Sequence, residues 1–263
     1  GRDRVFISVT LGDELSAHAS TLAALGGAGH PVIEMRLADI YALGGEFLRW
    51  EAATAIAGQI LGINPFDQPD VELAKKLAIS RLNQAGEEGK AAPPGVELKG
   101  DGFRLHIGKA AFEKAGYKGE DAIDALKGFL KLIGKDDYIG LLAYYDPFDA
   151  RIAESFAQTR KALNGAAGVA TQFGYGPRYL HSTGQLHKGR PNCGVFIIFC
   201  HEALEDFKVP GSSFSFSGLE LSQAFGDMEA LDSKGSRVAL VVMDGPSIEA
   251  LRKFSELLKA AAL

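Results

Sequence analysis

Short apolar segments alternate with longer amphipathic segments along most of the 263 residues. The apolar segments have the length and the β-branched and aromatic content of buried strands, whereas the longer segments repeat their apolar residues with helical periodicity. This alternation favours an α/β fold in which helices cover a parallel sheet. We predict strands at 5–9, 32–37, 138–145, 168–173, 195–199 and 237–243, and helices at 14–25, 43–61, 70–84, 149–163, 219–225 and 247–262.

The helix predicted at 43–61 is rich in Ala, Leu and Ile and has few helix breakers before Gly62 and Pro65. A helix that is apolar on most of its surface is usually buried, so we expect this one to be largely buried.

Turn-forming residues are concentrated between 86 and 102, and this composition predicts a domain boundary. We therefore expect a first α/β lobe at 1–90 and a second at 136–263. Residues 91–135 are predicted to be a linker that contains a short helix at 119–132 and a hairpin turning at Asp101-Gly102.

Composition limits the classes of function. The net charge of -5 lacks the basic surplus of a typical nucleic-acid binder, so we expect no nucleic-acid partner. No apolar run is long enough to span a membrane, and residues 1–4 lack the apolar region of a signal peptide, which predicts a cytoplasmic protein. Cys193 and Cys200 stand apart from any further cysteine, so neither a disulfide nor a metal site is expected.

The first stretch that could carry chemistry is 61–76, where Asn64, Asp67 and Gln68 interrupt apolar residues just before a predicted helix. Backbone N–H groups gather at helix starts, so such a loop suits an anionic ligand.

A structural interpretation of the same stretch is also open. Asp67 or Asp70 could cap the helix, and Glu72 could pair with Lys75 or Lys76 on a solvated face.

The second such stretch is 173–192, where Gly and Pro alternate with hydrogen-bonding and basic side chains. Fixed donors and cations suit a hydroxyl-rich, phosphorylated ligand, and the alternative is a hydrated loop of incidental polarity. The polar residues of this stretch include Arg178, His181, Ser182, Thr183, Gln185, His187, Lys188, Arg190 and Asn192.

Competing motifs fail in this stretch. Gly174-Tyr175-Gly176 begins like a dinucleotide fingerprint, but Tyr179 stands where the third glycine belongs. His181 and His187 lack a further ligand at metal-binding spacing. The other histidines have no motif around them, and surface or capping roles are expected for His18, His30, His106 and His201.

Both stretches resemble parts of the phosphoglucose isomerase family. Phe66-Asp67-Gln68 followed by Val71-Glu72-Leu73-Ala74-Lys75 is similar to that family's signature. Residues 44–51 and 176–185 look most like the isomerase portion of bifunctional transaldolase/phosphoglucose isomerase fusions, and this resemblance runs over nearly the whole chain.

The resemblance implies a sugar-isomerase (SIS) type three-layer αβα sandwich with a mainly parallel sheet. It also implies a glucose 6-phosphate/fructose 6-phosphate substrate pair, no cofactor, and a cytoplasmic homodimer with sites shared across the interface. Lys75 takes the place of the lysine near the sugar ring oxygen, and His181 that of the histidine that helps open the ring. The residues expected to bind substrate are Gln68, Glu72, Arg178, Ser182, Thr183 and Gln185.

The chain departs from the family pattern in three ways. The phosphate-binding Ser/Thr loop and the Gly-Gly-Arg segment are absent, no Gly-Glu-Ser motif follows Tyr145-Asp146-Pro147, and the lysine segment precedes the histidine loop. We therefore expect a C-terminal fragment of a larger enzyme that is incomplete in isolation. The base is not identified; Glu51 and Glu72 are the local carboxylates. The alternative is a non-catalytic sugar-phosphate-binding or regulatory module of the same fold.

Overall fold

The computed structural model describes residues 4–13, 16–67, 69–84, 93–189 and 191–262. The chain divides into two compact units, Gly1–Asp67 and Gln68–Leu263, called units 1 and 2 below.

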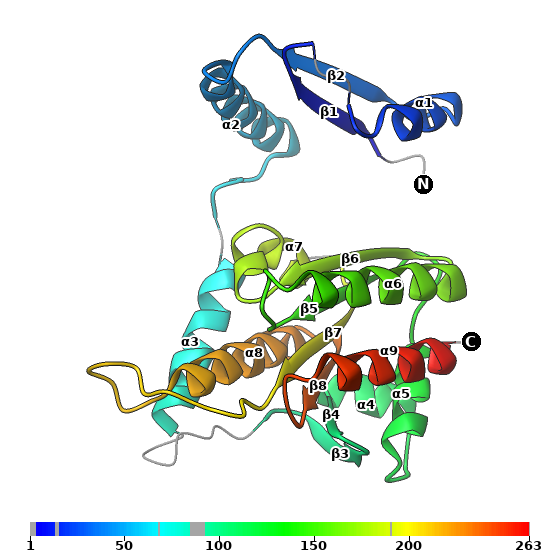
Figure 1. The fold of residues 1–263 in the computed structure, drawn as a ribbon, viewed down its shortest axis with the longest axis vertical. Helices are drawn as coiled ribbons and strands as arrows, with labels where there is room; N and C mark the ends of the chain where they lie inside the picture. The colour runs from blue at the N-terminus through cyan, green and yellow to red at the C-terminus, as the bar shows by residue number, and fades with distance from the viewer. Residues whose placement is uncertain (1–3, 14–15, 68, 85–92, 190, 263) are drawn as a thin grey trace. The chain divides into compact units, whose positions relative to one another are not determined.

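Unit 2 is built on a six-stranded sheet in the order β3-β4-β8-β7-β5-β6 (Figure 1). β8, β7, β5 and β6 are parallel to one another, whereas β4 runs antiparallel to both β8 and β3. The strands are β3 (Val96–Gly100), β4 (Phe103–Ile107), β5 (Tyr138–Ala143), β6 (Ala170–Tyr175), β7 (Gly194–His201) and β8 (Arg237–Met243).

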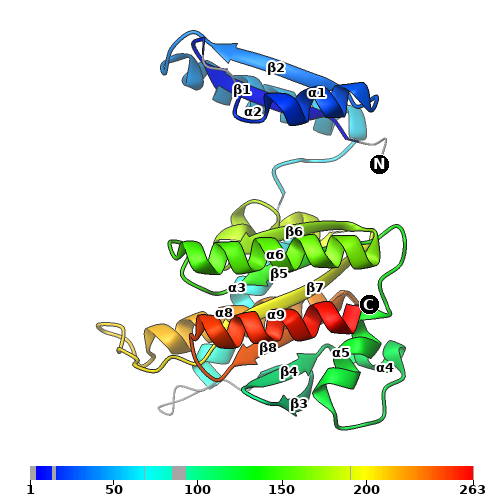
Figure 2. The ribbon, with the colours of Figure 1, turned by 45° about the vertical axis from the view of Figure 1, so that its right-hand side comes forward.

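Helices cover both faces of this sheet, because alternate strand residues point to opposite cores. Leu141 packs into a core with α5, α6 and α9, whereas its neighbour Leu142 packs into a second core with α8. Figure 2 shows α6 and α9 on one side of the strands and α8 on the other. These helices are α5 (Ala122–Leu130), α6 (Ala150–Ala167), α8 (Phe216–Ser233) and α9 (Ile248–Ala262).

The predicted three-layer αβα class with a mainly parallel sheet is confirmed. The two central strands β7 and β8 are buried almost throughout, as expected for parallel strands covered on both faces. Side chains cap two of the helices at their N-termini: the Asp149 carboxylate accepts from the N–H of Arg151, and Ser247 accepts from the N–H of Ala250.

Residues 91–135 differ from the linker that the sequence predicts, since the described part of this segment belongs to the sheet. The hairpin forms as expected, and β4 then pairs with β8 along its length. The helix α4 (Lys109–Ala115), which we did not predict, follows β4. Local turn signals predicted the hairpin but could not reveal its long-range partner strand.

The division between the units also differs from the predicted boundary near residue 90. It falls between Asp67 and Gln68, because α3 (Pro69–Gln84) packs along α8 of unit 2. The contact is close: a Cβ added to Gly226 of α8 would lie 2.7 Å from the backbone nitrogen of Ala78. Arg81 of α3 also forms an ion pair with Glu229 of α8 at 2.7 Å. The turn formers predicted to mark the boundary lie partly at 85–92, outside the described residues.

Unit 1 contains two parallel strands, β1 (Phe6–Leu11) and β2 (Val32–Leu37), and two helices, α1 (Ala19–Gly27) and α2 (Ala42–Leu61). The predicted helix start at 14–15 lies outside the described residues. Helix α2 ends at Gly62, whose left-handed φ of 68° suits glycine.

The expectation that α2 is largely buried is wrong for this structure, because its buried residues are Glu46 and Gly58 alone. Apolar composition predicted burial, but the described part of unit 1 offers the helix only a two-stranded sheet. Large apolar side chains of α2, such as Phe47, Leu48 and Ile60, are consequently exposed.

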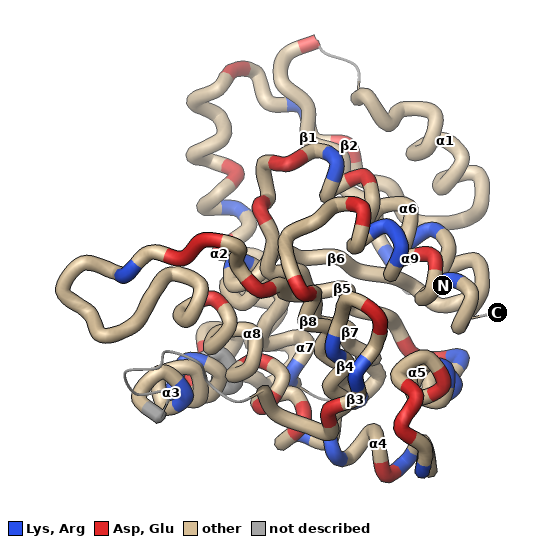
Figure 3. The backbone as a smooth tube through the Cα atoms, turned by 60° about the horizontal axis from the view of Figure 1, so that its bottom comes forward, with Lys and Arg blue, Asp and Glu red and all other residues tan. Residues whose placement is uncertain are grey.

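Charged residues of both signs are interspersed along the chain (Figure 3). Within the described residues, no helix has the length and apolar character needed to cross a membrane.

The α3–α8 contact gives a first prediction. Gly226→Ala should lower the free energy of unfolding by about 1–3 kcal/mol, because the added methyl group overpacks against the α3 backbone. Gly165→Ala in α6 is the matched control, since a Cβ there meets no atom within 4 Å and helix propensity favours alanine. Urea unfolding measures the free energy of unfolding of both variants. Equal stability of the Gly226→Ala and Gly165→Ala variants would contradict the close contact between α3 and α8.

Candidate functional site

The connections of the parallel strands diverge between β5 and β7. From β5 the chain passes through α6 to β6 on one side, and from β7 it passes through α8 to β8 on the other. In open α/β sheets, ligands bind outside the carboxyl ends of the strands at such a switch point. The carboxyl ends of β5 and β7 are therefore the position at which the fold favours a site.

A pocket of about 530 Å³ lies at these strand ends, and we call it the strand-end pocket. Its size is within the range of small-molecule sites. It is lined by Tyr145, Asp146, Pro147, Tyr175, Gly176, Pro177, Arg178, His181, His201 and Glu220.

A second pocket of about 250 Å³ lies between α3, α8 and the short 3₁₀ helix η2 (Arg178–His181), and we call it the α3 pocket. Lys75 and His181 both line it, together with Gln223 and a mainly apolar wall. The wall consists of Ala74, Ala78, Ile79, Leu82, Pro177, Leu180 and Leu219.

The two pockets share Pro177 and His181. The structure thus brings together three residues that the sequence predicts in a site: Lys75 and His181 in the α3 pocket, and Arg178 with His181 in the strand-end pocket. Arg178 lies with its guanidinium carbon 6.0 Å from the ring centre of Phe148.

Glu72 lines neither pocket. Its carboxylate accepts a hydrogen bond from Lys75 Nζ at 2.9 Å, and this contact lowers the pKa of Glu72. The pairing that the structural interpretation predicted is therefore present. Both side chains are exposed, so the pair is weak and a ligand could replace it at little cost.

Ser182, Thr183 and Gln185 also line neither pocket, and their substrate contacts stay predictions. The Ser182 hydroxyl donates to the carbonyl of Tyr179 at 3.2 Å. Gln185 lies half-buried on α7 (Gly184–Lys188). The predicted substrate residue Gln68 lies outside the described residues.

The segment that carries His181 is anchored by buried polar contacts. His187 lies between Tyr138 Oη, 2.8 Å from its Nδ1, and Thr183 Oγ1, 3.0 Å from its Nε2. Its burial lowers the imidazole pKa to about 4. The next residue, Lys188, forms a fully buried ion pair with Asp227 of α8. Burial raises the pKa of Asp227, and the ammonium group of Lys188 favours its ionised form.

Five polar residues of the strand-end pocket were not named as site residues in the sequence analysis: Tyr145, Asp146, Tyr175, His201 and Glu220. His201 was expected at the surface or in a cap, but it ends β7 and its ring packs edge-on against Tyr145 at 4.8 Å. Tyr145 follows β5 and His201 ends β7, so their positions at the ends of predicted parallel strands were a usable signal. Glu220 lies inside α8 and carries no comparable signal.

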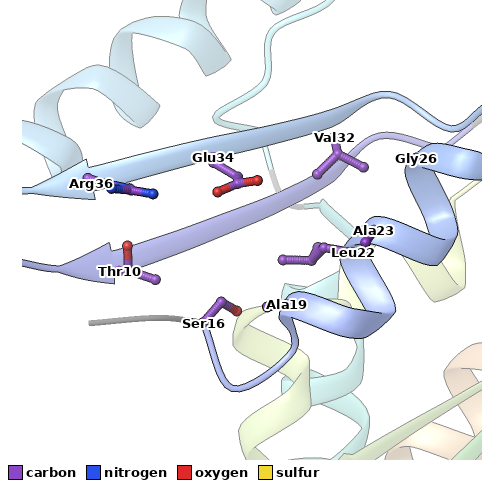
Figure 4. Close-up of a pocket in the computed structure, with 9 residues that line it drawn as sticks. All are labelled: Thr10, Ser16, Ala19, Leu22, Ala23, Gly26, Val32, Glu34 and Arg36. Carbon is purple, nitrogen blue, oxygen red and sulfur yellow. The ribbon is translucent and has the colours of Figure 1, made fainter. Parts of the chain in front are cut away.

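Unit 1 has a hollow of its own, of about 300 Å³, between its sheet and α1 (Figure 4). Thr10, Glu34 and Arg36 project from the strands on the side that faces Leu22 of α1. None of the site residues predicted from the sequence lies in this hollow.

Among the described residues, no group of three or more His, Cys, Asp or Glu side chains is placed to hold a metal ion. Cys193 and Cys200 are free thiols.

The burial of His187 predicts a pH dependence of stability. Because the pKa falls from the ordinary 6.5 to about 4 on folding, the unfolded chain binds a proton more tightly than the folded chain does. The free energy of unfolding should therefore fall as the pH drops from about 6.5 to about 4, by on the order of 3 kcal/mol or less from this residue.

Urea unfolding across this pH range measures the effect. His187→Gln should make the fall shallower, whereas His18→Gln, at an exposed position of unit 1, should keep the wild-type profile. A His187→Gln profile parallel to that of the wild type would refute the buried neutral imidazole.

Comparisons with known proteins find partial similarity, and no protein-family model matches the chain. The chain is 39% identical over 80 residues to a glucose-6-phosphate isomerase from Rubrobacter xylanophilus, covering 29% of this chain and 18% of the relative. It is 37% identical over 95 residues to the glucose-6-phosphate isomerase of Leptospira interrogans, covering 35% of this chain and 19% of the relative. It is 44% identical over 59 residues to the glucose-6-phosphate isomerase of Exiguobacterium sibiricum, covering 22% of this chain and 13% of the relative.

Each match thus spans a fifth or less of the relative's length, and none of these three names mentions a transaldolase. A crystal structure of a hypothetical protein from Thermus thermophilus aligns with a TM-score of 0.47 and 14% identity, covering 99% of this chain and 56% of that one. Part of the chain is therefore similar in sequence to glucose-6-phosphate isomerases.

Proposed function

We propose that this chain is a sugar-phosphate isomerase module acting on the glucose 6-phosphate/fructose 6-phosphate pair. The observation that carries the proposal is that Lys75 and His181, more than a hundred positions apart in the sequence, line one pocket. The partial similarity to glucose-6-phosphate isomerases supports the same reaction class.

The first chemical step is opening of the sugar ring. It requires removal of a proton from the anomeric hydroxyl and delivery of a proton to the ring oxygen. An imidazole group can donate a proton, so His181 is suited to deliver the second proton, and the Lys75 ammonium group polarises the oxygen. Isomerisation then moves a proton between C2 and C1 through an enediolate.

The phosphate of the substrate needs a cation or N–H donors. Arg178 lines the strand-end pocket, which shares His181 with the α3 pocket, and its guanidinium group can bind a phosphate with two hydrogen bonds. In this proposal Gln68, Glu72, Ser182, Thr183 and Gln185 support the bound sugar around these three residues.

The finer assignments are part of the same proposal. The module belongs to the C-terminal part of a larger cytoplasmic enzyme of carbohydrate metabolism that resembles the transaldolase fusions, and it works as a homodimer without a cofactor. The short coverage of the relatives' length is compatible with a module of this kind.

A second candidate is a non-catalytic module that binds sugar phosphates. The observation in its favour is that Lys75 is paired with Glu72, which is what a solvated helix surface would show. This candidate predicts micromolar to millimolar binding of fructose 6-phosphate in calorimetry, but no isomerisation even when the upstream part of the larger enzyme is restored.

The isomerase proposal predicts that Lys75→Ala and His181→Ala, each made in the larger enzyme that contains this module, lower the turnover of fructose 6-phosphate by about a hundredfold, because each removes a group that assists proton transfer. A coupled assay for glucose 6-phosphate measures this turnover. Lys76→Ala is the matched control, since Lys76 is exposed on the same helix and lines neither pocket. Wild-type activity in both pocket variants would reject the assignment. A larger enzyme that binds fructose 6-phosphate without turnover would favour the second candidate.

A further inference from the structure

The strand-end pocket holds polar groups that the proposed roles of Lys75, His181 and Arg178 leave unused. They come from separate parts of the chain: Tyr145 from the end of β5, His201 from the end of β7 and Glu220 from α8. Convergence of acid–base side chains from several elements at a switch point is the usual construction of an active site in an α/β fold.

Two tyrosine hydroxyls that line the pocket, those of Tyr145 and Tyr175, are buried and have no hydrogen-bond partner within the described residues. Tyr145 is 4% exposed. A buried hydroxyl that lacks a partner loses the free energy of hydration, so it is better satisfied when a polar ligand is present. This observation points to a ligand with hydroxyl groups rather than to an apolar one.

Two carboxylates line the pocket, and their surroundings differ. Asp146 is exposed, and its Oδ1 accepts from the N–H of Phe148 at 2.9 Å, which holds the turn after β5. Glu220 is partly buried, and this burial raises its pKa while the nearby His201 opposes the shift. A partly desolvated carboxylate in a cleft, beside an imidazole, is the better proton acceptor of the two.

We propose that Glu220 is a catalytic residue of this site, which takes the proton from the anomeric hydroxyl of a hexose phosphate during ring opening. The inference rests on the proposed function for the class of substrate. His201 lies beside the Glu220 carboxylate, and Tyr145 binds a hydroxyl group of the sugar.

The step balances without a further reactant. The carboxylate of Glu220 takes the proton from the hydroxyl oxygen on C1, and that oxygen's electron pair forms the C1 carbonyl. The bond between C1 and the ring oxygen breaks, its electron pair stays on the ring oxygen, and the imidazolium of His181 protonates that oxygen. Both side chains line the pocket in which this transfer would occur.

Ring opening can be measured separately from isomerisation, because it also interconverts the α and β anomers of glucose 6-phosphate. Exchange NMR on the full chain gives the anomerisation rate above that of buffer, and a coupled assay gives isomerisation. We expect Glu220→Gln to lower the anomerisation rate by about a hundredfold. Calorimetric binding of fructose 6-phosphate should stay within about threefold of the wild type, since the amide keeps the shape of the side chain.

Glu205→Gln is the control, because Glu205 is an exposed carboxylate that lines neither pocket. If Glu220→Gln fails to fold, Glu220→Asp replaces it, and partial loss is expected because the shorter carboxylate is withdrawn from the sugar.

The outcomes separate this inference from the proposed function. An isomerising wild type with an undiminished Glu220 variant would overturn the role of Glu220 and leave the isomerase proposal in place. If anomerisation depends on Glu220 but no isomerisation is detected, the role of Glu220 in ring opening stands and the isomerase proposal is overturned. A wild-type chain that does not accelerate anomerisation would overturn the inference.

Discussion

The close approach of α3 to α8 is the contact on which the candidate site depends. It is possible because Gly226 has no side chain where the backbone of α3 passes, and because Ala74 and Ala78 are small. A bulkier contact would move α3 away from α8 and carry Lys75 away from His181. The separation of two proposed catalytic groups is thus set by small residues that take no part in chemistry.

The sheet fixes the second half of the site. Strands buried on both faces bring the carboxyl ends of β5 and β7 together, so Tyr145 after β5 and His201 at the end of β7 both line the strand-end pocket. The segment after β6 is held on this edge by the His187 contacts and by the buried pair between Lys188 and Asp227. His181 can therefore remain exposed while its backbone is anchored.

Sequence reasoning predicted most of the strands and helices, because hydrophobic periodicity is local. The bounds of β2 and β8, for example, are those expected from their apolar runs. It did not predict that β4 pairs with β8, that α3 joins unit 2, or that α2 is exposed, since each depends on a partner distant in sequence. Lys75, His181 and Arg178 could be predicted because they lie in local motifs. Glu220 could not, because its place in the pocket depends on how α8 packs against the sheet.

The central claim is that Lys75 and His181 serve one ligand in one pocket. NMR of selectively labelled lysine and histidine side chains during a fructose 6-phosphate titration tests it directly. The account predicts that the signals of Lys75 and His181 shift together and saturate with one dissociation constant, while that of Lys76 stays unchanged. Signals of Lys75 and His181 that do not shift, or that saturate with different constants, would contradict it.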